Sequence, residues 1–343
     1  MQLVRVLIVD DSATARSLIR TNLMRDRRFS VVGEAATADE ARAAIKRLNP
    51  DVLTLDIEMP KMNGLEFLKR LMKLRPMPVL MVSSQTEKGS QRALEALSLG
   101  AVDCIGKPSA FMNDELKTLP DRLYIAANAQ TRTLNNNTPK AAKSDWIWNG
   151  KTVFLGASTG GVGAIETVLS TMPEDCPPIL ISQHMPSGFI ESLAQRLDRM
   201  FAPGVQVAED GQEITPGQVY LAPGGKYDLV LDQKRGLHCK IINGEPNALY
   251  SPSVDVMFKS AVGLGKKSIG VLLTGMGRDG ADGMKAMRNA GAQTIAQDEG
   301  TCVVYGMPKA ACDIGAVVKT VELNKTADFL MAATRSRSEI TTK

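Results

Sequence analysis

The feature that most constrains the fold is a regular alternation of short apolar runs with longer amphipathic segments. In the first part of the chain, amphipathic segments such as 13–24 and 65–74 separate apolar runs of four to six residues. Continuous apolar strands that alternate with helices are typical of a parallel sheet covered on both faces. The sequence therefore predicts a doubly wound α/β domain with five strands, at residues 4–9, 31–35, 52–55, 78–83 and 102–105.

The same alternation starts again at residue 151, after a polar segment without periodicity. Residues 131–149 contain asparagines, a proline and scattered lysines, a composition typical of a linker. Beyond it the sequence predicts a second, larger parallel sheet with strands at 152–155, 179–182, 269–274 and 293–296. We interpret the short alternating segments between turn signals at 205–242 as antiparallel strands added to that sheet.

These patterns predict two α/β domains joined by a linker. The boundaries that we expect are a first domain at 1–128, a linker at 129–150, a second domain at 151–335 and a frayed tail at 336–343. Trp146 and Trp148 lie where the linker meets the second domain, and we expect them to anchor that end by burial.

Composition excludes several functional classes. The five cysteines have no CxxC spacing, which argues against a disulfide framework or a zinc site and favours a reducing cytoplasm. No apolar run has the length of a membrane span, so we expect no membrane insertion. Residues 151–343 carry 19 basic and 20 acidic residues, and aromatic residues make up 4% of the chain, which argues against a nucleic-acid partner. We expect a cytoplasmic monomer.

Polar residues follow the predicted strands of the first domain at the edge where parallel sheets carry their chemistry. Asp10 and Asp11 follow the first strand, Asp56 follows the third, and Ser83 and Lys107 follow the fourth and fifth. Three converging aspartates repel one another unless a cation is present, and their hard oxygen ligands suit Mg²⁺. Any one aspartate in such a place is more often a helix cap, but the whole set is difficult to obtain by chance.

With the segment from Asp56 to Gly64, these residues closely resemble the receiver domain of bacterial response regulators over about residues 1–125. The resemblance implies that Asp56 accepts a phosphoryl group from a histidine kinase and that Ser83 and Lys107 bind the phosphoryl oxygens. It also implies a Mg²⁺ site with Asp11, Asp56 and the backbone carbonyl of Glu58 as ligands and with Asp10 assisting through water. One departure is Cys104, which stands where the family usually has the aromatic residue that turns inward on activation.

A glycine-rich turn follows the first predicted strand of the second domain. The pattern Gly156-Ala-Ser158-Thr-Gly160-Gly-Val-Gly163 contains G-x-S-x-G at a strand-to-helix turn, which is typical of a nucleophile elbow. Such a turn presents a serine hydroxyl, and the amides at the start of the helix stabilise an oxyanion. Dinucleotide-binding turns are also glycine-rich, but they need an acidic residue at the end of the next strand, and that strand ends in Gln183-His184.

His184 is one of only two histidines, and it lies at the same predicted sheet edge as Ser158. The carboxylate at the end of another parallel strand is Asp279, with Asp282 as the nearest rival. We therefore expect Ser158, His184 and Asp279 to form a catalytic triad in which Asp279 fixes the imidazole tautomer. Three backbone amides are candidates for an oxyanion hole: Thr159, Gly160 and Met276.

These residues, with Gln183-His184-Met-Pro186, Ser251-Pro-Ser-Val-Asp255 and Leu273-Thr-Gly-Met-Gly-Arg-Asp-Gly280, resemble the catalytic domain of CheB-type chemotaxis protein-glutamate methylesterases. The resemblance implies hydrolysis of glutamate γ-methyl esters on the cytoplasmic helices of chemoreceptors, with no cofactor for that step. It also implies deamidation of receptor glutamines and activation by receiver phosphorylation. We interpret 251–255 as a turn and a helix cap at Ser253.

Two other functions fit parts of the sequence. Receivers are often joined to DNA-binding modules, which would make the chain a transcription regulator, but residues 151–343 lack a basic excess. The glycine-rich turn at 156–163 would also suit an enzyme that uses a dinucleotide. A phosphorylation-activated esterase accounts for both constellations.

Overall fold

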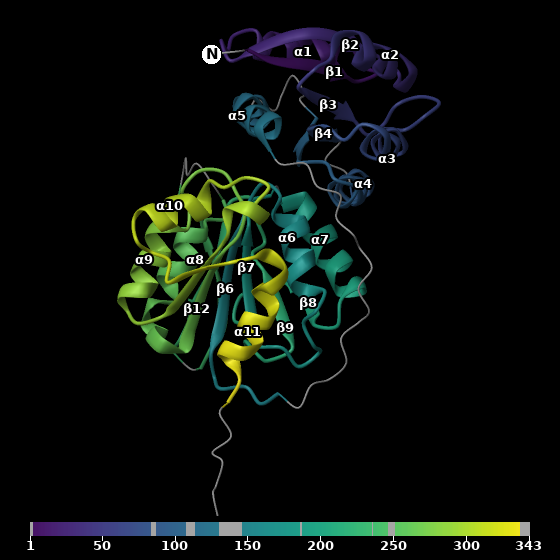
Figure 1. The fold of residues 1–343 in the computed structure, drawn as a ribbon. Helices are drawn as coiled ribbons and strands as arrows, with labels where there is room; N and C mark the ends of the chain where they lie inside the picture. The colour runs from purple at the N-terminus through teal and green to yellow at the C-terminus, as the bar shows by residue number, and fades with distance from the viewer. Residues whose placement is uncertain are drawn as a thin grey trace, which may run out of the picture. The chain divides into compact units, whose positions relative to one another are not determined.

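The computed structural model of the chain describes residues 3–83, 87–107, 114–129, 146–185, 187–234, 236–245 and 251–336. The chain divides into two compact units, Met1–Asn135 and Asn136–Lys343 (Figure 1). Most of the predicted linker therefore lies outside the described residues.

The first unit contains the predicted five-stranded parallel sheet, and its strand order is β2-β1-β3-β4-β5. Its strands are β1 (Val4–Val9), β2 (Phe29–Ala35), β3 (Val52–Asp56), β4 (Val79–Ser83) and β5 (Asp103–Gly106). Its helices are α1 (Ala13–Leu23), α2 (Ala38–Leu48), α3 (Gly64–Leu74), α4 (Glu87–Ser98) and α5 (Asp114–Asn128).

Local sequence explains where these elements begin. The side chains of Ser12, Thr37 and Asn63 each accept a hydrogen bond from a backbone N–H in the first turn of α1, α2 and α3. Every residue of β3 is buried, which accounts for its continuous apolar pattern. The strand order reverses beside β1 and β3, so their carboxyl ends flank the crevice in which ligands bind.

The second unit contains a seven-stranded parallel sheet with the order β14-β13-β12-β6-β7-β9-β8 and a separate antiparallel pair, β10-β11. The strands are β6 (Thr152–Ala157), β7 (Ile179–Gln183), β8 (Gly204–Val207), β9 (Gln218–Leu221), β10 (Tyr227–Asp232), β11 (His238–Asn243), β12 (Ser268–Leu272), β13 (Gln293–Gln297) and β14 (Lys319–Val321). The α-helices are α6 (Gly161–Leu169), α7 (Ser187–Met200), α8 (Val254–Ser260), α9 (Ala281–Asn289), α10 (Met307–Asp313) and α11 (Thr326–Thr334). Three 3₁₀ helices are η1 (Val262–Lys267), η2 (Glu299–Thr301) and η3 (Leu323–Lys325).

The interpretation of residues 205–242 is right for one pair of strands and wrong for the other. β10 and β11 form the expected antiparallel hairpin. β8 and β9 are instead parallel, pair with each other and extend the main sheet through β7. The misleading signal is the connection between them: it is short, contains no helix, and carries Gly217 at a positive φ, as a hairpin turn would.

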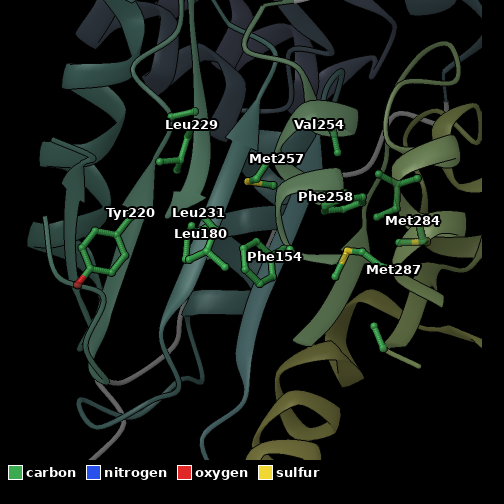
Figure 2. Close-up of a cluster of buried hydrophobic side chains, with 14 of the residues drawn as sticks. Phe154, Leu180, Tyr220, Leu229, Leu231, Val254, Met257, Phe258, Met284 and Met287 are labelled. Atoms are coloured by element: carbon green, nitrogen blue, oxygen red, sulfur yellow. The ribbon is translucent and has the colours of Figure 1, made fainter. Parts of the chain in front are cut away.

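One core cluster joins the main sheet to the helices that cover it (Figure 2). Phe154 of β6 and Leu180 of β7 contribute from the sheet, while Phe258 of α8 and Met287 of α9 contribute from the helices, and all four are fully buried. Figure 1 shows helices on either side of this sheet, so the unit is doubly wound, as predicted.

The beginning and the end of the second unit are paired with each other. Trp146 is half-buried and donates its indole N–H to the Met331 carbonyl at 3.0 Å. Trp148 and Arg335 form an antiparallel bridge, and the Ser336 N–H donates to the Ile147 carbonyl at 2.7 Å. Ser336, the first residue of the predicted tail, takes part in this pairing, and residues 337–343 lie outside the described ranges.

Two further findings concern disulfides and membrane-spanning helices. The five cysteines all lie in described ranges and form no disulfide. Across the part of the chain that the structure describes, no helix combines the length and the apolar character that crossing a membrane requires.

Candidate active site and acidic cluster

Ser158 and His184 follow two neighbouring strands of the second unit. β6 and β7 pair in register up to Ala157 and Gln183, and the His184 N–H donates to the Ala157 carbonyl at 3.1 Å. Paired strands lie about 4.8 Å apart, so the residues that follow the pair are direct neighbours at the sheet edge. The structure thus brings the predicted nucleophile and base to one place.

The predicted elbow forms at the end of β6. Gly160 has φ +78°, a conformation that favours glycine, and α6 begins at the next residue. The Gly161 N–H donates to the Ser158 carbonyl at 2.7 Å, and the Ser158 N–H donates to the Thr274 carbonyl at 3.0 Å. These bonds fix the serine backbone from both sides, while the residue itself is 9% exposed.

His184 and Asp279 are in direct contact. His184 Nε2 and Asp279 Oδ2 are 2.8 Å apart, and both residues are buried. Burial raises the pKa of Asp279, but the hydrogen bond from His184 and those from backbone N–H groups outweigh it, so the pKa is lowered. An ionised Asp279 accepts the proton of Nε2, which leaves Nδ1 as the basic nitrogen.

The start of α8 holds Asp279 in place. The Ser253 hydroxyl donates to Asp279 Oδ1 at 3.1 Å, the Val254 N–H donates to Oδ2 at 2.7 Å, and the Asp255 N–H donates to Oδ1 at 2.9 Å. Ser253 also caps α8 by accepting from the Val256 N–H, as the sequence predicts. The segment is therefore more than a cap, because it orients the candidate triad carboxylate.

Asp228 is a residue of this site that sequence reasoning missed. It lies on β10, is buried, and accepts a hydrogen bond from the Ser253 N–H at 2.7 Å. Burial raises its pKa, and the negative charge of Asp279 adds to the effect. A single aspartate within a short strand carries no sequence signal that would link it to residue 253.

The remaining candidates are also placed. Thr159 is buried, and its carbonyl accepts from the Thr274 hydroxyl at 3.0 Å. Met276 belongs to a loop whose Gly275 carbonyl accepts from the N–H groups of Gly306 and Met307. The rival Asp282 is exposed, and its carboxylate is paired with Arg278.

The acidic cluster of the first unit forms as predicted. Asp10, Asp11 and Asp56 each offer a carboxylate oxygen, and these oxygens all lie within 4.8 Å of one another. Asp10 and Asp56 are each 1% exposed, and Asp10 Oδ2 has no hydrogen-bond partner among the described residues. Three carboxylates and an unpartnered buried oxygen fit a hard divalent cation such as Mg²⁺.

Lys107 reaches the same cluster. Its ammonium lies 2.9 Å from Asp56 Oδ2 and 3.3 Å from Asp10 Oδ1. Burial raises the pKa of Asp56 to about 6, the charge of Asp10 adds to this, and Lys107 opposes it. Burial lowers the pKa of Lys107, but its bond to Asp56 outweighs burial, so that pKa is raised. One ammonium does not balance the charge of three ionised carboxylates, so the cluster can accept further positive charge.

We predicted two further residues for this cluster, Glu58 and Ser83. The Glu58 carboxylate is exposed and faces Arg92 at 3.3 Å, so only its backbone carbonyl is a candidate ligand. Ser83 ends β4 beside Gly106 of β5, but its side chain lies outside the described residues. Cys104, at the position expected to be aromatic, is buried in β5.

Comparisons with known proteins match both parts of the chain. The CheB methylesterase family matches residues 153–330, and the response regulator receiver domain family matches residues 6–118. The chain is 49% identical over 343 residues to protein-glutamate methylesterase/protein-glutamine glutaminase 1 of Caulobacter vibrioides, covering 98% of this chain and 100% of that protein. It is 47% identical over 345 residues to the corresponding protein of Agrobacterium fabrum, covering 98% of each.

A solved structure agrees with these matches. The catalytic domain of the Thermotoga maritima CheB methylesterase aligns with a TM-score of 0.52 and 37% identity, covering 54% of this chain and 98% of that one. The esterase family covers the region that the two alternative hypotheses needed for DNA or dinucleotide binding, so we set them aside. The chain belongs to the CheB family of chemotaxis protein-glutamate methylesterases/protein-glutamine glutaminases that carry a receiver domain.

Proposed function

We propose that the second unit hydrolyses glutamate γ-methyl esters with Ser158 as nucleophile, His184 as general base and Asp279 as the carboxylate that orients the base. The single observation that carries this proposal is the buried His184–Asp279 hydrogen bond of 2.8 Å beside the serine elbow. A serine at a strand-to-helix turn, with a histidine oriented by a buried carboxylate, is suited to acyl transfer.

The chemistry proceeds in two halves. Nδ1 of His184 takes the proton of the Ser158 hydroxyl while Oγ attacks the ester carbonyl carbon, which forms a tetrahedral intermediate. The C–O bond to the methoxy group then breaks, the imidazolium returns its proton to that oxygen, and methanol leaves. In the second half, His184 deprotonates a water that attacks the acyl-serine, which releases the glutamate carboxylate and restores the serine.

Backbone N–H groups stabilise the developing oxyanion in this proposal. The candidates are the amides of Thr159 and Gly160 at the start of α6 and the amide of Met276 in the neighbouring loop. Amides at the beginning of a helix favour negative charge, and the backbone holds them in place before the reaction starts. The Thr274 hydroxyl, bonded to the Thr159 carbonyl at 3.0 Å, supports that orientation.

The same acyl-enzyme chemistry accounts for deamidation. If the substrate is a glutamine side chain, ammonia replaces methanol as the leaving group and the hydrolytic half is unchanged. The relatives from Caulobacter vibrioides and Agrobacterium fabrum are named for both activities. We propose chemoreceptor cytoplasmic helices as the substrate and the cytoplasm as the location.

The first unit controls this activity in our proposal. Asp56 accepts a phosphoryl group from a histidine kinase, and Lys107 and Ser83 bind the phosphoryl oxygens. Asp11, Asp56 and the Glu58 carbonyl would hold Mg²⁺, with Asp10 assisting through water, and the bound ion would supply positive charge that neutralises the phosphoryl oxygens. Burial of Asp56 and the contact with Lys107 support this assignment.

Phosphorylation relieves inhibition of the esterase by the receiver. Such a switch requires that the phosphoryl group bind with different affinity to the inhibited and the active states. Because position 104 holds a cysteine, the switch does not use an aromatic ring at this position.

One experiment tests both halves of the proposal. Methanol release from a methylated receptor fragment is measured with and without Mg²⁺ and acetyl phosphate, for the wild type and the variants Ser158→Ala and Asp56→Ala. We expect Ser158→Ala to abolish release and Asp56→Ala to abolish the response to acetyl phosphate. Hydrolysis by Ser158→Ala at the wild-type rate contradicts the nucleophile assignment. A wild-type response in Asp56→Ala contradicts the switch.

A further inference from the structure

The side chain of Gln183 connects the backbones of Ser158 and His184. Gln183 ends β7, lies directly before His184, and is 3% exposed. Its Nε2 lies 3.0 Å from the Ser158 carbonyl oxygen and 3.2 Å from the His184 carbonyl oxygen. One amide group thus donates its two N–H bonds to the carbonyls of the proposed nucleophile and the proposed base.

The surroundings determine which way this amide points. Two carbonyl oxygens face Nε2, and turning the amide over would place Oε1 against both of them. In the present orientation Oε1 of Gln183 is buried and has no hydrogen-bond partner within the described ranges. A buried polar atom without a partner destabilises a fold, so the two donated bonds are kept at a cost in stability.

Gly161 makes the space for this amide. A Cβ added at Gly161 would lie 2.1 Å from Gln183 Oε1 and 2.8 Å from the Ala157 Cβ, well inside contact distance. Any larger residue at the start of α6 would therefore displace the glutamine. The G-x-S-x-G pattern does not require a glycine at position 161, and the position of Gln183 explains why a residue without a Cβ stands there.

We propose that Gln183 is a positioning residue for hydrolysis: its amide holds the carboxyl ends of β6 and β7 so that the Ser158 hydroxyl and His184 Nδ1 meet when substrate binds. This proposal rests on the proposed function. Its physical basis is that a displacement of about 1 Å in a reacting group lowers the rate about 100-fold. Gln183 touches no reacting atom and acts through the two backbones.

The test uses the full chain with two substitutions at this position. Gln183→Met removes both donors at similar size, and Gln183→Glu keeps the shape but has no N–H. Gln206→Met is the matched control, because Gln206 also loses a side-chain hydrogen bond, to Gln218 at 3.0 Å, on the edge strand β8. The probes are a peptide that carries a glutamate γ-methyl ester, for methanol release, and a fluorophosphonate, for the reactivity of Ser158.

We expect Gln183→Met to lower kcat about 10- to 100-fold with KM within about twofold of wild type, and to slow fluorophosphonate labelling by a similar factor. The control stays within about twofold in both assays. A role confined to stability would lower the melting temperature and leave kcat and the labelling rate of the folded protein unchanged, which overturns the proposal.

The outcomes separate this proposal from the function on which it rests. Hydrolysis that survives Ser158→Ala contradicts the proposed function. A chain that Ser158→Ala inactivates, but in which Gln183→Met hydrolyses at the wild-type rate, contradicts the positioning role alone. If Gln183→Met does not fold, the same kinetic comparison is made with Gln183→Glu, for which we expect an equal or larger loss because its carboxylate faces two carbonyl oxygens.

Discussion

Gly275 is a sharp test of how closely the loop after β12 approaches the nucleophile. A Cβ added at Gly275 would lie 2.8 Å from the Ser158 Cβ, 3.1 Å from the Ser158 nitrogen and 2.3 Å from the Met307 sulfur. Gly275 does not have a positive φ, so alanine can adopt its backbone conformation. The effect of Gly275→Ala is therefore steric.

The distances give the expected size of the effect. Carbon atoms pack at about 3.5–4.0 Å, so the contact of 2.8 Å with Ser158 requires about 0.7–1.2 Å of movement. The Met307 side chain can turn away, but the Ser158 Cβ is attached directly to the backbone of the elbow. A displacement of about 1 Å lowers the rate about 100-fold, and overpacking destabilises the fold by about 1–3 kcal/mol.

The assay measures kcat and KM for methanol release together with the melting temperature. Gly270→Ala is the matched control, because Gly270 lies on β12 and its added Cβ would meet Met287 and Thr294 at 3.3–3.5 Å, which is close to ordinary contact. We expect Gly275→Ala to lose about 100-fold in kcat and Gly270→Ala to stay within about twofold. Wild-type kcat in Gly275→Ala, or an equal loss in both variants, would refute the reasoning.

Three more outcomes follow from the structure. Asp279→Asn should lower kcat by about three to four orders of magnitude, because the base loses its orienting carboxylate. The control Asp282→Asn should leave kcat and the pH–rate profile unchanged, and an equal loss of kcat in both variants would refute the assignment. Mg²⁺ at about 100 times its Kd should stabilise the first unit by about 2.7 kcal/mol in thermal unfolding, and Asp10→Ala should remove most of that gain; an unaltered gain excludes this site. Burial raises the pKa of Glu166, which Arg196 only partly offsets. The folded state therefore binds more protons than the unfolded state, and the free energy of unfolding falls as pH rises above 4.5. Glu166→Gln should remove this fall in urea titrations, whereas the exposed control Glu191→Gln should keep it.

The fold and the principal site residues could be predicted because they depend on patterns that are local in sequence. Apolar runs of strand length and helix-length spacers identify both parallel sheets, and polar residues directly after strands identify Asp10, Asp56, Ser158 and His184. A parallel sheet places such residues at one edge whatever the intervening sequence is.

The residues that were missed act through contacts between distant segments. Asp228 bonds the backbone of Ser253, and Ser253 then bonds Asp279. Neither link has a sequence pattern: the first uses a backbone N–H, which almost every residue has, and the second joins a serine hydroxyl to a carboxylate 26 residues away. The orientation of His184, with Nε2 toward Asp279, likewise depends on tertiary packing and could not be derived from spacing.

The pairing of Trp148 with Arg335 has a consequence for how the two units can influence each other. β6 begins at Thr152, directly after this pairing, and Ser158 follows its opposite end, about 20 Å away for six residues of strand. Tension carried along the chain from the first unit would therefore be borne by the paired ends and would not reach the nucleophile.

In the proposed switch, signalling between the units would then be non-covalent, and the chain between them would serve as a tether. A tether contributes by setting the effective concentration of one unit around the other, in the millimolar range for short connections. Lengthening the segment would be expected to weaken the coupling gradually, roughly as the −3/2 power of its length, rather than to abolish it.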